Sequence, residues 1–282
     1  MARGRTRLTT RTSFADAPSA LTVPRISWRV NAERLALLGW GRAILLQFAH
    51  PLVAAGVDAH SAFRRNWWTG ATRLHSTIHA MLALTFGTDA QRHSTLHGIL
   101  TIHRRVNGQL PIAVGPFPAG TRYSAEDASL VEWVHLTLLD SMPLVYELLV
   151  APLSDEDRDA YCEEAAWVAR ALGARPSRIP LTWKDTQGAL QQAYASGSIT
   201  VGPQARDLAA TVLAPGIGRV MPPAAWLSRL ITVGLLPPHI REQYGFEWTP
   251  RRQRALDRAV PLVRALRRRA PDTVALWAEA RG

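Results

Sequence analysis

The sequence predicts an all-α fold. Apolar residues recur at helical spacing along most of the chain, and no stretch shows the alternation of apolar and polar residues that a half-buried strand requires. Prolines and glycines separate the helical segments, and no internal repeat is present. The chain has 282 residues, of which 47% are hydrophobic, so it can bury a core of its own. We therefore expect a single helical domain over residues 25–282.

Residues 1–24 differ from the rest of the chain. They carry four arginines followed by small and turn-forming residues, so we expect a flexible basic arm. The arm has no apolar stretch of the kind found in secretory signals, and no window of the chain is apolar enough to span a membrane. The single cysteine, Cys162, excludes an intramolecular disulfide and a thiolate metal cluster, and it fits a cytoplasmic protein.

The net charge of +11 comes almost wholly from arginine, since Lys184 is the only lysine. No helix-turn-helix, zinc-finger or aromatic–basic motif accompanies this charge, so we expect no nucleic-acid partner. Eight arginines lie between residues 251 and 269, on a helix that also has an apolar face. Such a helix can lie on an anionic membrane, or it can be a solvated surface helix packed on its own domain, and the sequence favours the second.

The helices of the first half are predicted from their caps and stops. Asn31 is a good N-cap for a strongly apolar helix that runs to the His-Pro pair at 50–51. Thr69 or Thr72 is expected to cap the next long helix, which ends before Gly87. A further helix is predicted from about residue 89 to residue 107.

The second half contains a long loop and then more helices. Residues 109–122 hold three prolines and two glycines and are predicted to form the loop. Ser124 with Asp127 resembles the capping box of the following helix, which Pro143 should kink. The remaining helices are predicted to begin at Ser154 and Thr182 and to cover 203–214, 223–236, 238–244 and 249–269.

Eight of the nine histidines fall between residues 50 and 135. His103 and His135 take positions on apolar helical stripes, where a polar ring needs a partner. A histidine in this setting can hold a haem iron, although it is more often a satisfied core residue, and Arg104 directly after His103 can pair with haem propionates. His50, at a helix boundary, either caps a helix end or lines a pocket.

Other metal sites have weaker signals. Two histidine pairs are spaced four residues apart, as zinc ligands on one helix face are, namely His75 with His79 and His93 with His97. Neither pair contains the glutamate of the H-E-x-x-H motif. Glu132 and His135 form one E-x-x-H unit, whereas a di-iron bundle needs two such units and two further glutamates. A non-haem, histidine-ligated metalloenzyme therefore remains an alternative.

Five segments of the chain carry a family resemblance: LLQFAHPLVAAGVDAHS, TRLHSTIHAMLALTFG, ILTIHRRVNG, YSAEDASLVEWVHLTLLDSMPLVYELLVAPLS and LLPPHIREQYGFEW. In order and spacing, from about residue 34 to 270, they resemble the family of the MpaB oxygenases and rubber oxygenases (latex clearing proteins). The resemblance implies a haem b protein with a globin-like helical core and additional helices. It also implies that dioxygen is used on an apolar, unsaturated or isoprenoid-like substrate.

The resemblance also assigns roles to single residues. His103, in IHRRVNG, matches the proximal haem histidine of the family. The rubber oxygenases carry Arg-x-x-Lys-Thr on the distal side of the haem. Arg73 and Thr77 match that motif, and Ser76 replaces its lysine, which changes the group that can donate or ligate there. His135 matches a further histidine, which is expected behind the iron ligand.

His50 matches a His-Pro pair of the shorter family members and is expected on the distal side. The sequence thus predicts a haem b-dependent oxygenase in which His103 holds the iron. The alternatives are a non-haem metalloenzyme and a haem- or lipid-binding protein without turnover. The chain lacks the long flanking segments of the polymer-cleaving members, so a small apolar substrate is expected together with dioxygen. Substrate identity, electron donor and oligomeric state are not predicted.

Overall fold

The computed structural model describes the chain over residues 25–60, 67–213 and 222–281. The side chains of residues 67–75 and 222 lie outside this description, as does the basic arm expected over residues 1–24. Within the described residues the chain forms thirteen α-helices and one two-stranded sheet, so the all-α prediction is confirmed.

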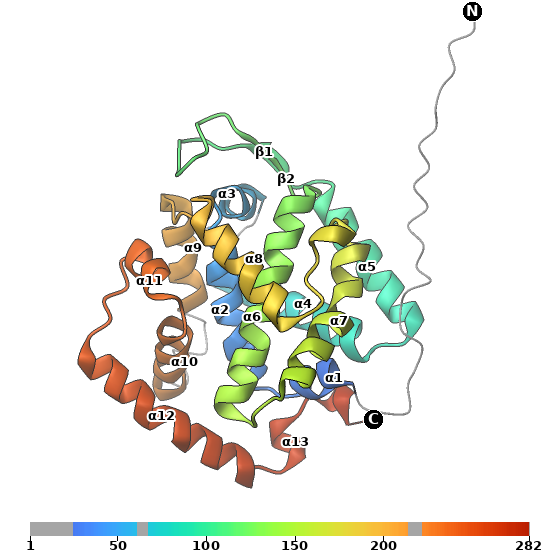
Figure 1. Ribbon diagram of the computed structural model, residues 1–282, viewed down its shortest axis with the longest axis vertical. Helices are drawn as coiled ribbons and strands as arrows, with labels where there is room; N and C mark the ends of the chain where they lie inside the picture. The colour runs from blue at the N-terminus through green and yellow to red at the C-terminus, as the bar shows by residue number, and fades with distance from the viewer. Residues whose placement is uncertain (1–24, 61–66, 214–221, 282) are drawn as a thin grey trace, which may run out of the picture.

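In chain order the helices are α1 (Ile26–Asn31), α2 (Ala36–Phe48), α3 (Pro51–His60), α4 (Trp67–Phe86), α5 (Asp89–His103), α6 (Ala128–Leu149), α7 (Asp155–Ala171), α8 (Trp183–Ala195), α9 (Pro203–Leu213), α10 (Pro222–Gly234), α11 (Pro238–Tyr244), α12 (Pro250–Arg269) and α13 (Asp272–Ala275). The strands β1 (Asn107–Gln109) and β2 (Arg122–Ser124) pair antiparallel between α5 and α6. In Figure 1 this hairpin lies at one end of the helical body, and α12 and α13 lie at the other.

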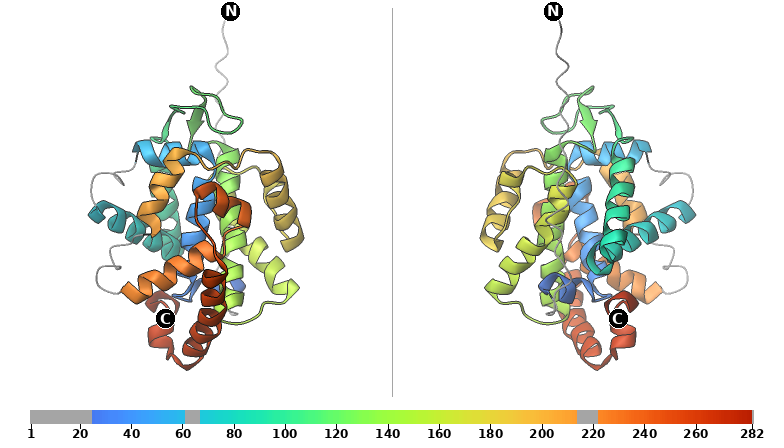
Figure 2. Two further views of the ribbon diagram at one scale, coloured as in Figure 1. Left: turned by 90° about the vertical axis from the view of Figure 1, so that its left-hand side faces the viewer. Right: turned by 90° about the vertical axis from the view of Figure 1, so that its right-hand side faces the viewer.

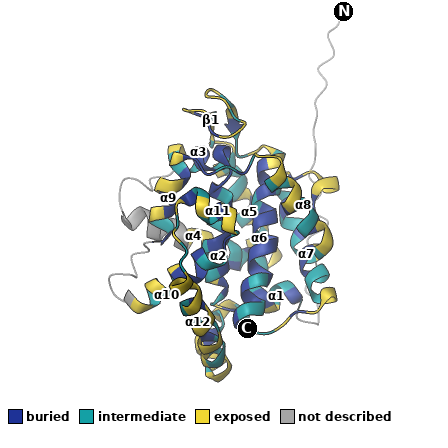
Figure 3. Ribbon diagram, turned by 60° about the vertical axis from the view of Figure 1, so that its left-hand side comes forward, coloured by how far each residue is buried: buried dark blue, intermediate teal, exposed yellow. Residues whose placement is uncertain are grey.

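Helices α2 and α6 form the centre of the fold, and most of their residues are buried (Figure 3). They approach closely at Gly39, where a Cβ would lie 3.0 Å from the Ser141 carbonyl oxygen. The buried guanidinium of Arg42 joins the two helices, because its Nη1 lies 2.6 Å from Asp140 Oδ2 and donates a 2.7 Å hydrogen bond to Ser141 Oγ. A buried charge requires such pairing, so these contacts set how α2 packs along α6.

Several predicted helix ends are confirmed. The side chains of Ser154, Thr182 and Thr249 each accept a hydrogen bond from the amide three residues on, at the starts of α7, α8 and α12. Helix α4 ends at Phe86, as predicted. Helix α6 contains Pro143 and continues beyond it to Leu149.

Two predicted helix starts are wrong. Asn31 ends α1 instead of capping the long apolar helix, which begins five residues later at Ala36. Between the two helices the chain bends to meet its own C-terminal part, because Glu33 pairs with Arg267 at 2.6 Å and its backbone forms a bridge with Leu276. Helix α4 begins at Trp67, before both of the threonines proposed as its cap.

The predicted end of the helix that carries His103 is also wrong. Helix α5 stops at His103, and residues 107–109 form β1. Residues 107–109 pair with residues 122–124 instead of continuing the helix. Glycine at 108 allows the close approach, since a Cβ there would lie 2.6 Å from the Tyr123 hydroxyl. Ser124 correspondingly ends β2 and does not cap α6. The cap is Asp127, which accepts a hydrogen bond from the Ser129 amide at 2.8 Å.

The C-terminal helices complete the body. Figure 2 shows from two sides how α10 and α12 pack beside the central helices, with α4 and α5 on the face turned toward the viewer in its right-hand view. No described helix combines the length and apolar character needed to cross a membrane.

Candidate functional site

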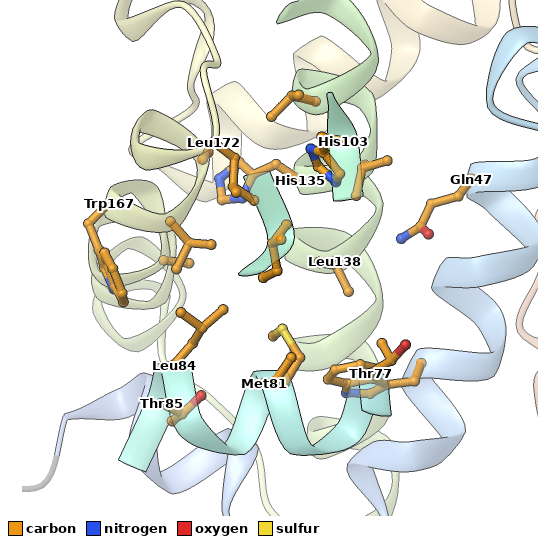
Figure 4. A pocket seen from close by; sticks show the side chains of 18 of the residues that line it. Gln47, Thr77, Met81, Leu84, Thr85, His103, His135, Leu138, Trp167 and Leu172 are labelled. Atoms are coloured by element: carbon orange, nitrogen blue, oxygen red, sulfur yellow. The ribbon is translucent and has the colours of Figure 1, made fainter. Parts of the chain in front are cut away.

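A cavity of about 1410 Å³ lies beside the central helix α6. Helices α4, α5 and α7 enclose it together with α6, and α1, α2, α3 and β2 add further lining residues. Most side chains that α6 and α7 present to it are apolar, as Figure 4 shows for Leu138 and Leu172. The volume exceeds the roughly 300–1,000 Å³ of typical small-molecule pockets, so a cofactor and a small substrate can share the space.

Three histidines line this cavity. His60 of α3 bonds to its own helix, with Nδ1 3.2 Å from the Gly56 carbonyl oxygen. The other two come from different elements. His103 is the last residue of α5, and His135 lies in the second turn of α6. In Figure 4 both rings lie at the same end of the cavity, across from the side that α4 forms. The structure therefore brings together two residues, 32 positions apart, that the sequence singled out separately.

Both imidazoles carry a buried ring nitrogen without a hydrogen-bond partner among the described residues, namely Nδ1 of His103 and Nε2 of His135. Burial lowers the pKa of His103, against a smaller opposing effect of Glu126. Burial lowers the pKa of His135 to about 4, with a further contribution from Arg170. Both rings are therefore neutral near pH 7, and a neutral imidazole has the lone pair that a metal ion requires.

Helix α4 supplies the predicted distal residues. Ser76 and Thr77 both line the cavity, and Figure 4 shows Thr77 on the side away from the histidines. Their hydroxyl groups can donate and accept hydrogen bonds there. The side chain of Arg73, predicted beside them, lies outside the described residues, so its role remains a prediction.

His50 does not line the cavity. Its Nδ1 accepts a hydrogen bond of 3.3 Å from the Leu52 amide, in the first turn of α3, and its ring centroid lies 5.3 Å from that of Phe117. Burial lowers the pKa of His50 to about 4, although the charge of Asp127 acts in the opposite direction. The sequence left open a cap that bonds a helix-end carbonyl and a role in lining a pocket. The structure shows His50 in a third role, as a cap that accepts a hydrogen bond from an amide at the start of α3.

Arg104 also lies away from the cavity. It is exposed, it is absent from the cavity lining, and its Nη2 donates a 2.9 Å hydrogen bond to Thr101 Oγ1. The structure therefore does not bring Arg104 to the cavity, where the sequence led us to expect it to pair with haem propionates.

The other histidine-based metal sites gain no support. Across the described parts of the chain, no three histidine, cysteine, aspartate or glutamate side chains gather where they could hold a metal ion. His93 and His97 are exposed, and the side chain of His75 is not described. Glu132 is held by Arg175 through two hydrogen bonds of 2.7 Å; burial alone would raise its pKa, but Arg175 keeps it below the ordinary value.

Sequence reasoning missed several lining residues. Gln47 of α2 is the clearest case, because it is one of only two polar residues in a helix that is otherwise apolar or glycine. That isolation was a usable signal, since a polar group in a core helix needs a partner or a ligand. Trp167 of α7 and Trp28 of α1 carry no comparable signal, because only packing brings those helices to the cavity.

The model of one protein family, described as "ER-bound oxygenase mpaB/B'/Rubber oxygenase, catalytic domain", matches residues 28–265. No curated protein and no solved structure matches the chain. The matched range contains α2 to α11 entirely, and with them almost every residue that lines the cavity. The chain therefore belongs to the family of the mpaB and rubber oxygenase catalytic domains, and it is an oxidoreductase of the oxygenase type.

Proposed function

We propose that the protein is a haem b-dependent oxygenase that acts with dioxygen on a small apolar, unsaturated or isoprenoid-like substrate. The observation that carries the proposal is the pair of neutral, unpartnered histidine rings at one end of a large apolar cavity. A buried nitrogen without a partner is costly unless a ligand satisfies it. Membership of an oxygenase family supplies the reaction class.

The residues around the cavity fit a haem. His103, at the end of α5, would hold the iron through a ring nitrogen, and the apolar side chains of α6 and α7 would surround the macrocycle. The cavity is large enough to leave room beside the cofactor. When bound, the haem supplies iron that reacts with dioxygen, which is chemistry that protein side chains do not perform.

The side chains contribute orientation and the exclusion of water. His135 is buried at the same end of the cavity as His103, and its lowered pKa keeps it uncharged, so it would adjoin the bound cofactor without adding charge. Met81, Leu84 and Leu138 keep water from the centre of the cavity. On the α4 side, the hydroxyl of Thr77 can hold a hydrogen-bonding atom in place, and Ser76, with a neutral hydroxyl in place of the lysine of relatives, does the same without a positive charge.

Absorption spectroscopy tests the cofactor. The full chain, produced with adequate haem supply, should show a strong Soret band that is lost in His103→Ala. The matched control is His97→Ala, on the same helix but exposed, which should keep the band. A colourless wild-type protein with stoichiometric zinc would exclude haem and restore the non-haem metalloenzyme.

Oxygen uptake tests the activity. Haem-loaded protein supplied with small unsaturated lipids and, where needed, an electron donor should consume dioxygen faster than the same protein without lipid. A Soret band with no substrate-dependent uptake across such a panel would favour a haem- or lipid-binding protein without turnover.

We further propose an anionic membrane surface as a partner, and the cytoplasm as the compartment. The proposed contact is helix α12, where Leu262 and Leu266 are 61% and 59% exposed. Five exposed arginines of α12 make no ion pair or hydrogen bond with any described residue: Arg251, Arg254, Arg258, Arg268 and Arg269. Exposed leucines between unpaired arginines suit a surface with both phosphate groups and acyl chains.

A further inference from the structure

Helix α2 contributes a single carboxamide side chain to the lining of the cavity. Helix α2 presents Trp40, Ile44 and Gln47 to the cavity, at positions that share one helix face. Figure 4 shows Gln47 reaching from α2 toward the cavity, on the same side as Thr77 of α4, with Leu138 of α6 nearby. A half-buried carboxamide in this place requires partners for both its oxygen and its amino group.

One hydrogen bond fixes how the carboxamide is turned. Thr137, which is fully buried in α6, donates its only hydroxyl proton to the Val134 carbonyl oxygen at 2.7 Å. The Thr137 oxygen can therefore only accept from Gln47, and it does so from Nε2 at 3.2 Å. A carboxamide turned the other way would place two acceptors against each other, so its amino group must face Thr137.

The carboxamide oxygen is then left without a partner. No described residue donates a hydrogen bond to Gln47 Oε1, and this atom is not among the fully buried polar atoms without a partner, so part of its surface is accessible. Because the Gln47 side chain lines the cavity, we infer that a ligand there can reach this oxygen. It is a fixed, uncharged acceptor at the edge of an apolar space. The group it suits is a neutral donor, because a protonated amine would bring a charge beside apolar side chains.

We propose that Gln47, held in place by Thr137, binds the hydroxyl group of an otherwise apolar ligand and so selects alcohols over hydrocarbons and ethers. This rests on the proposed function in one respect, namely that the cavity is where the substrate binds. The apolar body of the ligand lies along Leu138 and Met81, and its hydroxyl donates to Gln47 Oε1. A single neutral hydrogen bond of this kind changes affinity by roughly fivefold.

The test compares two isomers, octan-1-ol and heptyl methyl ether, by calorimetric titration of the purified full chain with the cofactor that it retains. The two have the same atoms, but only the alcohol has a proton to donate. The wild type should bind the alcohol about fivefold more tightly than the ether. In Gln47→Leu, this preference should fall to about one or below, with the ether bound as in the wild type.

A second variant separates recognition from packing. Thr137→Val removes the acceptor that orients the carboxamide while keeping the shape of the side chain, so it should also reduce the preference and leave ether binding intact. An equal affinity for both isomers in the wild type would overturn the proposal, as would a preference that survives Gln47→Leu, or an equal loss of both ligands in that variant. None of these outcomes depends on turnover, so a failure here is distinct from a missing Soret band or missing oxygen uptake.

Discussion

His50 illustrates what a single buried side chain contributes. Its ring accepts a hydrogen bond from the Leu52 amide and packs on Phe117. It thus takes the place of the serine, threonine, aspartate or asparagine side chain that usually caps a helix start, here that of α3. That hydrogen bond needs an unprotonated Nδ1, and burial lowers the pKa of the ring to about 4. We therefore expect the ring of His50 to make the stability of the fold depend on pH.

We predict that His50→Asn reduces this pH dependence. The pKa is about 4 in the folded chain and about 6.5 in the unfolded chain, so the unfolded state binds more protons between these values. The contribution of His50 is complete above about pH 6.5 and falls as the pH decreases toward 4, by about 3 kcal/mol in total. Asparagine keeps a capping oxygen but does not titrate.

The measurement is urea unfolding at about pH 7 and about pH 4.5 for both proteins. The drop in unfolding free energy between the two should be smaller in His50→Asn by about 2–3 kcal/mol. Part of the drop should remain, because His135 also has a pKa of about 4 when folded. Identical drops in both proteins would contradict the assignment.

At the scale of elements, the two interpretations of helix α12 differ in one feature. A solvated surface helix has a polar outer face, whereas a membrane-binding helix also exposes apolar side chains. The inner face of α12 packs through Leu256 and Val263 onto α6 and α10. Its outer face is not purely polar, because Leu262 and Leu266 stay exposed there. The rest of the domain therefore covers only some of the apolar side chains of this helix.

We predict that the full chain co-sediments with vesicles that contain phosphatidylglycerol and not with vesicles of phosphatidylcholine alone. Arg258→Gln should weaken binding by about fivefold, since each basic residue near an anionic surface contributes about 1 kcal/mol. Leu262→Ser with Leu266→Ser should weaken it further and make it more sensitive to salt. Arg258, Leu262 and Leu266 are all exposed, so these variants should remain folded.

The matched controls carry the same substitutions on other faces, Arg122→Gln in β2 and the exposed Leu181→Ser. They should bind as the wild type does. Binding that is equal for both vesicle types, or unaffected by the α12 substitutions while the controls reduce it, would rule out α12 as the contact. Binding to nucleic acid but not to vesicles would also rule out α12 as a membrane contact.

At the scale of the molecule, the cavity is assembled from elements spread along the chain. Its lining extends from Arg25, before α1, to Ala280, next to the C-terminus. A ligand that fills this space joins α4 and α5 to α6 and α7, so it should stabilise the whole fold by binding the native state alone.

We predict that haem raises the melting temperature of the haem-depleted protein. A ligand at about a thousand times its dissociation constant adds about 4 kcal/mol, which corresponds to roughly 10 °C for a chain of this size. His103→Ala should lose most of this gain while melting near the wild-type apoprotein. An unchanged melting temperature with excess haem would contradict haem binding in the cavity.

The sequence by itself determined the helical class, the caps at Ser154 and Thr182, and the two histidines on apolar stripes, because these depend on contacts within a few residues. It also indicated the family, since all five segments that carry the resemblance lie within the range that the family model matches. What helical periodicity could not show was where a helix stops when a distant strand competes for its residues, as β2 does after His103.

Only the tertiary structure decided which candidates share a site. It placed His103, His135, Ser76 and Thr77 around one cavity and left His50 and Arg104 outside it. His50 and Arg104 instead bond to groups within three residues of themselves, namely the Leu52 amide and the Thr101 hydroxyl. Gln47 joined the site because α2 packs on α6 at Gly39, which is a contact between residues about a hundred positions apart. Local sequence patterns do not show which residues that are far apart in the chain come together. The packing of the core decides that.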